Sequence, residues 1–361
     1  MNQDRLAERV AYKLIHHACR LQAGDVALLC GRRDQLDLLL RLEFHALAAG
    51  ARAVIVIEDE ERLRRLLREL SPASAANERL SLVPAAQTVT HVLDLTNGAP
   101  DLRGLPQQTL QAWQDANHTP QAALRQHLRA QIDIALPSRR QAQRLRQPFH
   151  PFNDAIWRAL DTDYALMEQR GRHLQAALSE AAVVRLSDVR GTALTLRLAA
   201  GAGARAEADG PAKLLLPAGE FRVAVAAGTA EGEAIIDAGW LQGKPLRHLR
   251  LRFQAGRVVG IEGAGAAQAE AALASAAGAP LLSKLSIGLN PAVTSLRPYP
   301  LGQEAALLAY RRAGAVFLTL GDNRADGGSH RPALAWNLGL ARAMLEVDGQ
   351  VILRSGEFAA S

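Results

Sequence analysis

The sequence predicts an α/β protein in which an N-terminal domain built on a parallel sheet is followed by a β-rich α+β domain. In the first half, helical and strand patterns alternate, which is the βαβ order of a parallel sheet covered on both faces. After about residue 180 the pattern changes to closely spaced short strands. The 361 residues are enough for two cores. We expect an N-terminal domain over 1–150, a connecting helix over 151–180 and a second domain over 181–361.

The elements of the first half follow from the spacing of apolar residues. Leu6, Val10 and Leu14 mark one face of a first helix. Strands are expected at "DVALLC", "ARAVIVIED", "THVLDLTN" and "AQIDIALP", and helices at "QLDLLLRLEFHALAAG" and "EERLRRLLREL". Each strand is a short, nearly continuous apolar run, which is typical of a buried parallel strand.

The second half begins with a long helix, expected at "DAIWRALDTDYALMEQRGRHLQAALSEA" with Asn153 or Asp154 as its N-cap. The strands expected after it are "AVVRLSD", "TALTLRL", "KLLLP", "EFRVAVA", "EAIIDAGW", "LRLRF" and "RVVGIEG". The Gly- and Ala-rich segment "AAGAGARAEADGPA" is expected to be a flexible loop between two of these strands.

The composition is that of a globular protein, with 48% hydrophobic and 22% charged residues. The net charge of +6 invites comparison with nucleic-acid-binding proteins. However, only four of the 42 basic residues are lysine, which indicates a bias of composition. The densest basic segment, "RQHLRAQIDIALPSRRQAQRLRQPFH", has few aromatic residues on which bases could stack. We therefore expect a solvated or subunit-facing surface there, and no nucleic-acid partner.

The cysteines and the hydropathy predict the compartment. Cys19 and Cys30 lie in an expected helix and strand, without the spacing of a disulfide framework. No apolar run approaches the length of a membrane span. We expect a cytoplasmic protein that does not contact a membrane.

Common cofactor and catalytic motifs are missing from the sequence, which has no HExxH, GxSxG or Walker loop. "GIEGAGAAQAE" fails as a dinucleotide motif because Gln268 stands where the third glycine belongs. His16, His17 and Cys19 on the first helix are too few to make a metal site. We expect no cofactor.

Several segments in order resemble the thermophilic metallo-aminopeptidase family of the aminopeptidase T and aminopeptidase S type. They are "LPAGEFRVAVAAGTAEGEAIIDAGW", "FQAGRVVGIEG", "LSKLSIGLNPAV", "FLTLGDNRADGG" and "VDGQVILRSGEF", and "LQAGDVALLCG" and "ALAAGARAVIVIEDEERLRRLL" are similar as well. The resemblance covers nearly the whole chain and implies an aminopeptidase T-like fold. A ring-cleaving dihydroxypyridine dioxygenase shares that scaffold, so the scaffold alone does not fix the reaction.

The resemblance implies a metal centre whose ligands are mostly replaced here. The family's "PTGE" glutamate falls on Glu220, which is present. The other ligand positions fall on Lys284, Phe317, Ala335 and Asn337, whereas a divalent site needs several N, O or S donors. The dioxygenase pattern matches no better. We therefore expect no metal.

Lys284 replaces a metal ligand with a cation. Its ammonium can supply the positive charge of a metal and satisfy Glu220 directly. Burial could also free a nucleophilic or basic amine, and the alternative is an ion pair that only fills a former site. Ser283 and Ser286 flank this lysine and offer hydroxyl groups.

The segment "FLTLGDNRADGGSHRPALAWN" supplies the remaining candidates. His330 is the one imidazole near the loop that can titrate near neutral pH, and a surface histidine is the alternative. The expected ligand-contacting residues are Phe317, Asp322, Asn323, Ser329, Trp336 and Asn337. Phe317 and Trp336 are expected to make the former metal pocket smaller and more apolar.

These features lead to a functional hypothesis with three rivals. The chain is expected to bind or act on a small amino-acid-like or peptide-like molecule by metal-independent chemistry, with Glu220, Lys284 and His330 as catalytic candidates. The rivals are a working metallo-aminopeptidase with other ligands, a non-catalytic scaffold that binds a partner, and a nucleic-acid-binding protein. The resemblance also implies a homodimer.

Overall fold

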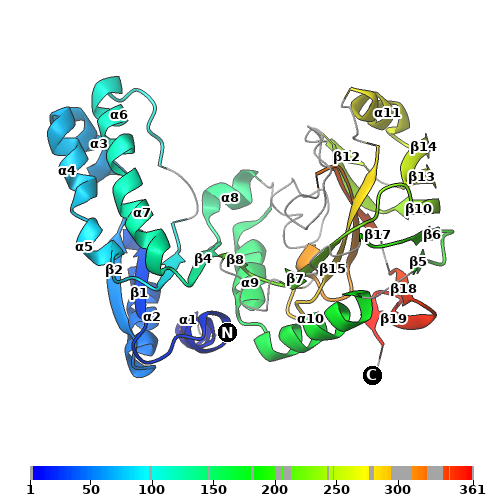
Figure 1. Ribbon diagram of the computed structural model, residues 1–361, viewed down its shortest axis with the longest axis horizontal. Helices are drawn as coiled ribbons and strands as arrows, with labels where there is room; N and C mark the ends of the chain where they lie inside the picture. The colour runs from blue at the N-terminus through cyan, green and yellow to red at the C-terminus, as the bar shows by residue number, and fades with distance from the viewer. Residues whose placement is uncertain are drawn as a thin grey trace. The chain divides into compact units, whose positions relative to one another are not determined.

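The computed structural model describes residues 3–96, 100–144, 147–179, 183–199, 205–206, 213–241, 244–246, 248–275, 280–293, 310–322, 336–340 and 342–359. The chain forms two compact units (Figure 1). The first contains residues 1–136 and 210–217, and the second contains residues 137–209 and 218–361. None of the helices in the described ranges is long and apolar enough to cross a membrane.

The first unit is built on a five-stranded sheet in the order β2-β1-β3-β4-β8, in which every pair is parallel. Its strands are β1 (Val26–Gly31), β2 (Arg52–Ile57), β3 (His91–Asp94), β4 (Ala130–Ile134) and β8 (Lys213–Leu216). The first four are the strands expected from the apolar runs. The parallel α/β class predicted for this part of the chain is therefore confirmed.

Helices connect and cover these strands. They are α1 (Gln3–Lys13), the π-helix η1 (Leu14–Cys19), the 3-10 helix η2 (Arg33–Gln35), α2 (Leu36–Ala48), α3 (Glu60–Glu69), α4 (Pro72–Leu80), α5 (Val83–Ala86), α6 (Gln107–Ala116) and α7 (His118–His127). Leu39 of α2 packs so closely on Gly31 that a Cβ there would lie 2.9 Å from the leucine side chain. On the opposite face, Val26 and Val92 pack with Leu124 of α7. Both faces of the central strands are thus covered, as a parallel sheet requires.

Strand β8 differs from the sequence-based expectation. The segment "KLLLP" was expected in the second domain, but Lys213–Leu216 pairs with β4 and completes the first sheet. The units also divide between Leu136 and Pro137, not near residue 150. Strand pairing explains the placement of β8, because an apolar run predicts a strand but does not indicate which distant strand it will pair with.

The long helix expected after residue 153 is two helices, α9 (Phe149–Leu160) and α10 (Tyr164–Ser179), preceded by α8 (Arg139–Arg144). Asn153 and Asp154 lie inside α9, so the expected N-cap was wrong. The break has a local cause, because Asp163 Oδ1 accepts a hydrogen bond from Leu166 N and caps the start of α10.

The second unit contains two sheets with antiparallel pairing. The eight-stranded sheet runs β14 (Arg257–Glu262), β13 (Leu249–Gln254), β10 (Glu231–Ile236), β6 (Ala193–Leu196), β5 (Val184–Ser187), β18 (Met344–Val347), β19 (Gln350–Arg354) and β20 (Glu357–Phe358). The seven-stranded sheet runs β12 (Lys244–Leu246), β11 (Ala238–Leu241), β17 (Trp336–Leu340), β16 (Val316–Leu320), β15 (Leu282–Gly288), β9 (Glu220–Ala224) and β7 (Arg205–Ala206). Helix α11 (Ala266–Ala274) lies beside β14 (Figure 1). A β-rich second domain is thus confirmed.

One face of the seven-stranded sheet is entirely apolar along its central strands. Strand pairing places alternate residues of β9, β15, β16 and β17 on this face. They are Phe221, Val223, Leu285, Ile287, Val316, Leu318, Leu320, Trp336, Leu338 and Leu340, and all are buried. This face forms part of the core of the second unit.

Candidate functional site

The opposite face of the same strands is polar. It carries Glu220, Arg222 and Ala224 from β9, Lys284 and Ser286 from β15, Phe317 and Thr319 from β16, and Asn337 from β17. We call this set the polar face. Its charged members are half-buried, so interactions with their charges are screened less than on an open surface. The polar face is therefore the candidate functional site.

A close backbone approach fixes the position of Glu220. Gly219, the residue before it, has φ +125°, and a Cβ at this position would lie 2.6 Å from Cβ of Asn290. The Gly219 carbonyl accepts a hydrogen bond of 2.8 Å from Leu289 N. The glycine of "PAGE" and the asparagine of "GLNP" are thus two halves of one contact, which anchors the start of β9 at the end of β15.

Asn290 is fully buried and uses both ends of its carboxamide. Its Nδ2 donates to the carbonyls of Ala159 and Ala218, at 3.0 and 2.9 Å. Its Oδ1 accepts from Thr162 Oγ1 at 2.7 Å and from Ala292 N at 2.9 Å. One side chain therefore ties the end of α9 and the loop before Glu220 to β15. The sequence analysis did not identify Asn290 as a structural anchor. The pattern that could have indicated it is an asparagine that follows an apolar strand.

Lys284 lies on the polar face with Glu220, but at a different level along the strands. Lys284 pairs with Ala224, whereas Glu220 pairs with Gly288. Four residues along a strand correspond to about 14 Å. The structure has no ion pair within 4.0 Å between these two described side chains. The direct pairing expected from the sequence is replaced by two opposite charges at separate levels of one face.

Arg222 lies between these two levels and was missed by the sequence analysis. It pairs with Ser286 of β15 on one side and with Arg205 of β7 on the other. The period of two in a strand was the signal that could have found it, since residue 222 must share the face of residue 220. The polar face thus combines one carboxylate with the cations of Arg222 and Lys284.

The remaining polar members surround the charged ones. Thr319 Oγ1 donates a 2.6 Å hydrogen bond to Asn337 Oδ1, which leaves the amide nitrogen of Asn337 as its donor group. Phe317 packs edge to face on Tyr310, with ring centroids 4.2 Å apart. Asp322 is half-buried two residues beyond the end of β16. The structure therefore brings Phe317 and Asn337 onto the same face as Glu220 and Lys284.

Other candidates do not lie on this face. Trp336 is fully buried and points to the apolar face, because its neighbour Asn337 points to the polar one. Ser283 donates its hydroxyl to the backbone carbonyl of Thr319 at 2.9 Å, a structural hydrogen bond. Trp336 is thus a core residue, and only Ser286 of the two serines lies on the polar face. Asn323, Ser329 and His330, like position 335, lie outside the described residues.

The side chains of the polar face do not make a metal donor set. Glu220 supplies its one carboxylate, and the other charged members, Arg222 and Lys284, are cations, which repel a metal ion. Within the described ranges, no group of three or more His, Cys, Asp or Glu is placed to hold a metal. The described residues therefore do not fit the metal that the family resemblance implies.

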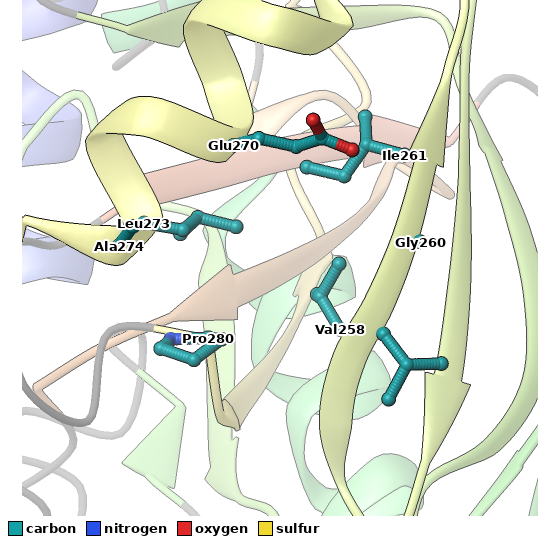
Figure 2. A pocket seen from close by; sticks show the side chains of 8 residues that line it. Val258, Gly260, Ile261, Glu270, Leu273, Ala274 and Pro280 are labelled. Atoms are coloured by element: carbon teal, nitrogen blue, oxygen red, sulfur yellow. The ribbon is translucent and has the colours of Figure 1, made fainter.

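A separate hollow of about 230 Å³ lies between α11 and the edge strand β14 (Figure 2). Figure 2 shows the Glu270 carboxylate beside Ile261, among aliphatic side chains. Glu270 is the one titratable residue among the eight that line it. None of the other seven lining residues offers a second acid, base or nucleophile with which the exposed Glu270 carboxylate could act in catalysis. The polar face therefore remains the candidate functional site.

The fold has known counterparts. AmpT from Thermus thermophilus superimposes with a TM-score of 0.61 at 19% identity over 99% of both chains. The 2,5-dihydroxypyridine dioxygenase from Pseudomonas putida KT2440 gives a TM-score of 0.62 at 14% identity, over 100% of this chain and 99% of the other. No family model and no curated protein matches the sequence. At these identities the likeness shows that the chain shares the fold of both proteins.

Proposed function

We propose that the chain binds a small amino-acid-like or peptide-like molecule on the polar face of the seven-stranded sheet and acts on it without a metal ion. The observation that carries this proposal is the placement of opposite charges on one half-buried face, with Glu220 at one level and Arg222 and Lys284 further along. Amino acids and short peptides carry a cation at one end and an anion at the other. The pattern of charges on the face is complementary to such molecules.

The spacing also suits such a ligand. Glu220 and Lys284 start about 14 Å apart along the strands, a distance that two long side chains and a bound molecule can fill together. An extended dipeptide spans about 7 Å. In this arrangement Glu220 holds the ammonium group, Arg222 and Lys284 hold the carboxylate, and the Asn337 amide donates to a carbonyl.

Lys284 is the residue proposed to do chemistry. Its ammonium has three donors, so while it holds the carboxylate it can also stabilise negative charge that develops on the neighbouring carbonyl oxygen, as a metal would in a related site. His330 is retained as a proposed general base. The alternative of a functional metallo-aminopeptidase requires ligands from residues outside the described ranges. The alternative of a non-catalytic scaffold requires that the charges serve stability alone.

Binding of L-leucylglycine by calorimetry, with hydrolysis followed by chromatography, tests the proposal on protein dialysed against EDTA. We expect binding to the metal-free protein and a loss of about 30-fold or more in Lys284→Met or Glu220→Gln, the effect of breaking a charged contact. Lys213→Met is the matched control, because Lys213 lies on β8 of the first unit. Glu262→Gln serves the same purpose for the carboxylate.

Two results would support the rivals. Near-stoichiometric Zn, Mn, Co or Fe by elemental analysis, together with hydrolysis that EDTA abolishes, would favour the metallo-aminopeptidase. Absence of binding by wild type, with Lys284→Met and Glu220→Gln less stable than the two control variants, would favour the scaffold. We further propose a cytoplasmic location, supported by the free cysteines Cys19 and Cys30, and a homodimer.

A further inference from the structure

A row of large apolar side chains is exposed along helix α2 of the first unit. Leu36, Leu40, Phe44 and Leu47 are 43%, 50%, 63% and 56% exposed. Their spacing of four, four and three residues puts them on one side of the helix. Leu39 and Leu42, on the other side, are fully buried against the sheet. We call the four exposed residues the α2 stripe.

The α2 stripe exposes as much apolar surface as the apolar part of a standard protein–protein interface. The four residues together expose about two whole large side chains, or roughly 400 Å² at about 200 Å² each. Tyr12, 46% exposed, adds to this near Phe44, because both rings contact that of His45. About 500 Å² of apolar surface is some 60% of the roughly 800 Å² that each partner contributes to a standard interface. That share matches the apolar fraction of known interfaces.

The rim beside the stripe does not oppose close approach. Arg41 Nε lies 3.0 Å from Asp37 Oδ2, and its Nη1 lies 2.9 Å from Glu8 Oε2. His45 Nε2 is also 2.9 Å from Glu8 Oε1. The Arg41 cation is thus already paired within its own chain, and exposed ion pairs of this kind contribute little to association in either direction.

The four residues of the α2 stripe are spaced almost symmetrically about the middle of the helix, so the spacing read from either end differs by only one residue. A two-fold axis between Leu40 and Phe44 would place Leu40 of one copy against Phe44 of the other, and Leu36 toward Leu47. Such self-complementarity is what an isologous interface requires. We propose that the α2 stripe is the surface on which a second copy of this chain docks, with the two α2 helices antiparallel. This inference assigns a surface to the proposed homodimer. It does not depend on the ligand proposed for the polar face, because the stripe and the polar face belong to different units.

Sedimentation velocity on the full chain at micromolar concentrations tests the proposal. We expect a wild-type dimer and a dissociation constant roughly 30-fold higher for Phe44→Glu, the effect of losing a central contact. Leu80→Glu is the matched control, since Leu80 is 39% exposed on α4. Circular dichroism should show both variants folded, because neither residue belongs to the buried core.

Disulfide trapping tests the register. A mixture of Leu40→Cys and Phe44→Cys chains should cross-link between the two variants faster than Leu80→Cys cross-links with itself. The native thiols react slowly, because burial raises the pKa of Cys19 and of Cys30 to about 12. A monomeric wild type, or a dimer that Phe44→Glu leaves intact, would overturn the proposal. So would cross-linking that is no faster than in the control.

Discussion

The parallel sheet of the first unit and the seven-stranded sheet of the second use their two faces differently. Helices cover both faces of the central parallel strands, and β1 is buried or half-buried at every position. Along its central strands, the seven-stranded sheet buries one face completely and places Glu220, Arg222 and Lys284 on the other. Polar groups of the parallel sheet are found mainly at strand ends, whereas in the seven-stranded sheet they point outward from within the strands.

This difference indicates which polar residues serve the fold and which can serve a ligand. Asp25, at the start of β1, accepts from Gln22 N and lies 2.7 Å from Arg129 Nη1. These contacts hold strand ends together. On the seven-stranded sheet, neighbouring positions of one strand have opposite consequences, because Phe221 belongs to the core and Glu220 to the polar face. Substitutions there should separate stability from binding.

The largest effect is expected from Phe221→Ala. Phe221 is fully buried on the apolar face, and truncation of a core phenylalanine costs about 3–5 kcal/mol of unfolding free energy. Glu220→Gln, one residue earlier, keeps the shape of the side chain and should change stability by less than about 1 kcal/mol. Urea denaturation followed by circular dichroism measures both. Equal losses in the two variants would contradict the division of the sheet into a core face and a ligand face.

A somewhat smaller loss is expected from Asn290→Ala. The change removes four hydrogen bonds and leaves the carbonyls of Ala159 and Ala218 buried without their donor. Leaving buried polar groups unsatisfied costs about 1–3 kcal/mol each, so a loss of about 3 kcal/mol is expected. Asn337→Ala, which removes one hydrogen bond to Thr319, should cost about 1 kcal/mol. A loss from Asn290→Ala no greater than that from Asn337→Ala would show that the anchor is dispensable.

Sequence patterns predicted the elements better than their pairing. The apolar runs of β1 to β4 predicted strands because burial on both faces leaves a continuous signal. The run "KLLLP" predicted a strand correctly, but nothing local indicated β4 as its partner. The break at Asp163 was visible as a capping residue, yet the apolar period on both sides favoured one helix.

The candidate site was predictable in kind but not in geometry. The motifs around Glu220 and Lys284 identified two adjacent strands, and the structure places both residues on one face. The level of each residue along the strands depends on the register, which the sequence does not state. Trp336 was assigned to the pocket although its neighbour Asn337 was assigned there too, and adjacent strand residues cannot share a face.

Acidification should lower the stability of the first unit by less than either of these core substitutions. Burial lowers the pKa of His91, and the Arg129 cation lowers it further against an opposing effect of Asp25. Burial also lowers the pKa of His16, with a further contribution from His45 and His17. Because the unfolded chain binds protons more readily, this stability is complete above the ordinary histidine pKa of about 6.5 and is lost as the pH falls through the lower folded values.

The melting temperature should therefore fall between about pH 7.5 and pH 5.5. The fall should be smaller in His91→Gln, which retains a side chain able to bond Thr90 Oγ1, the 2.9 Å partner of His91 Nδ1. Scanning calorimetry of both proteins at each pH measures the difference. An unchanged pH dependence in the variant would show that His91 does not titrate with unfolding.

The smallest expected effect is the coupling between Glu220 and Lys284 in the absence of a ligand. Their strand positions are four residues apart, about 14 Å, and sites farther apart than about 10 Å usually contribute additively to within 0.5 kcal/mol. A double-mutant cycle of Glu220→Gln and Lys284→Met, measured by urea denaturation, should therefore give a coupling below about 0.5 kcal/mol. Lys284→Met combined with Glu262→Gln sets the experimental error of additivity.

If the two charges met directly in a buried pair, breaking that pair would cost about 3–5 kcal/mol. A coupling of about 1 kcal/mol or more would already show that the Glu220 and Lys284 side chains reach each other. The same cycle repeated on L-leucylglycine binding should behave differently, because a ligand that spans both charges links them: either single change should remove most of the affinity, and the second change should remove little more.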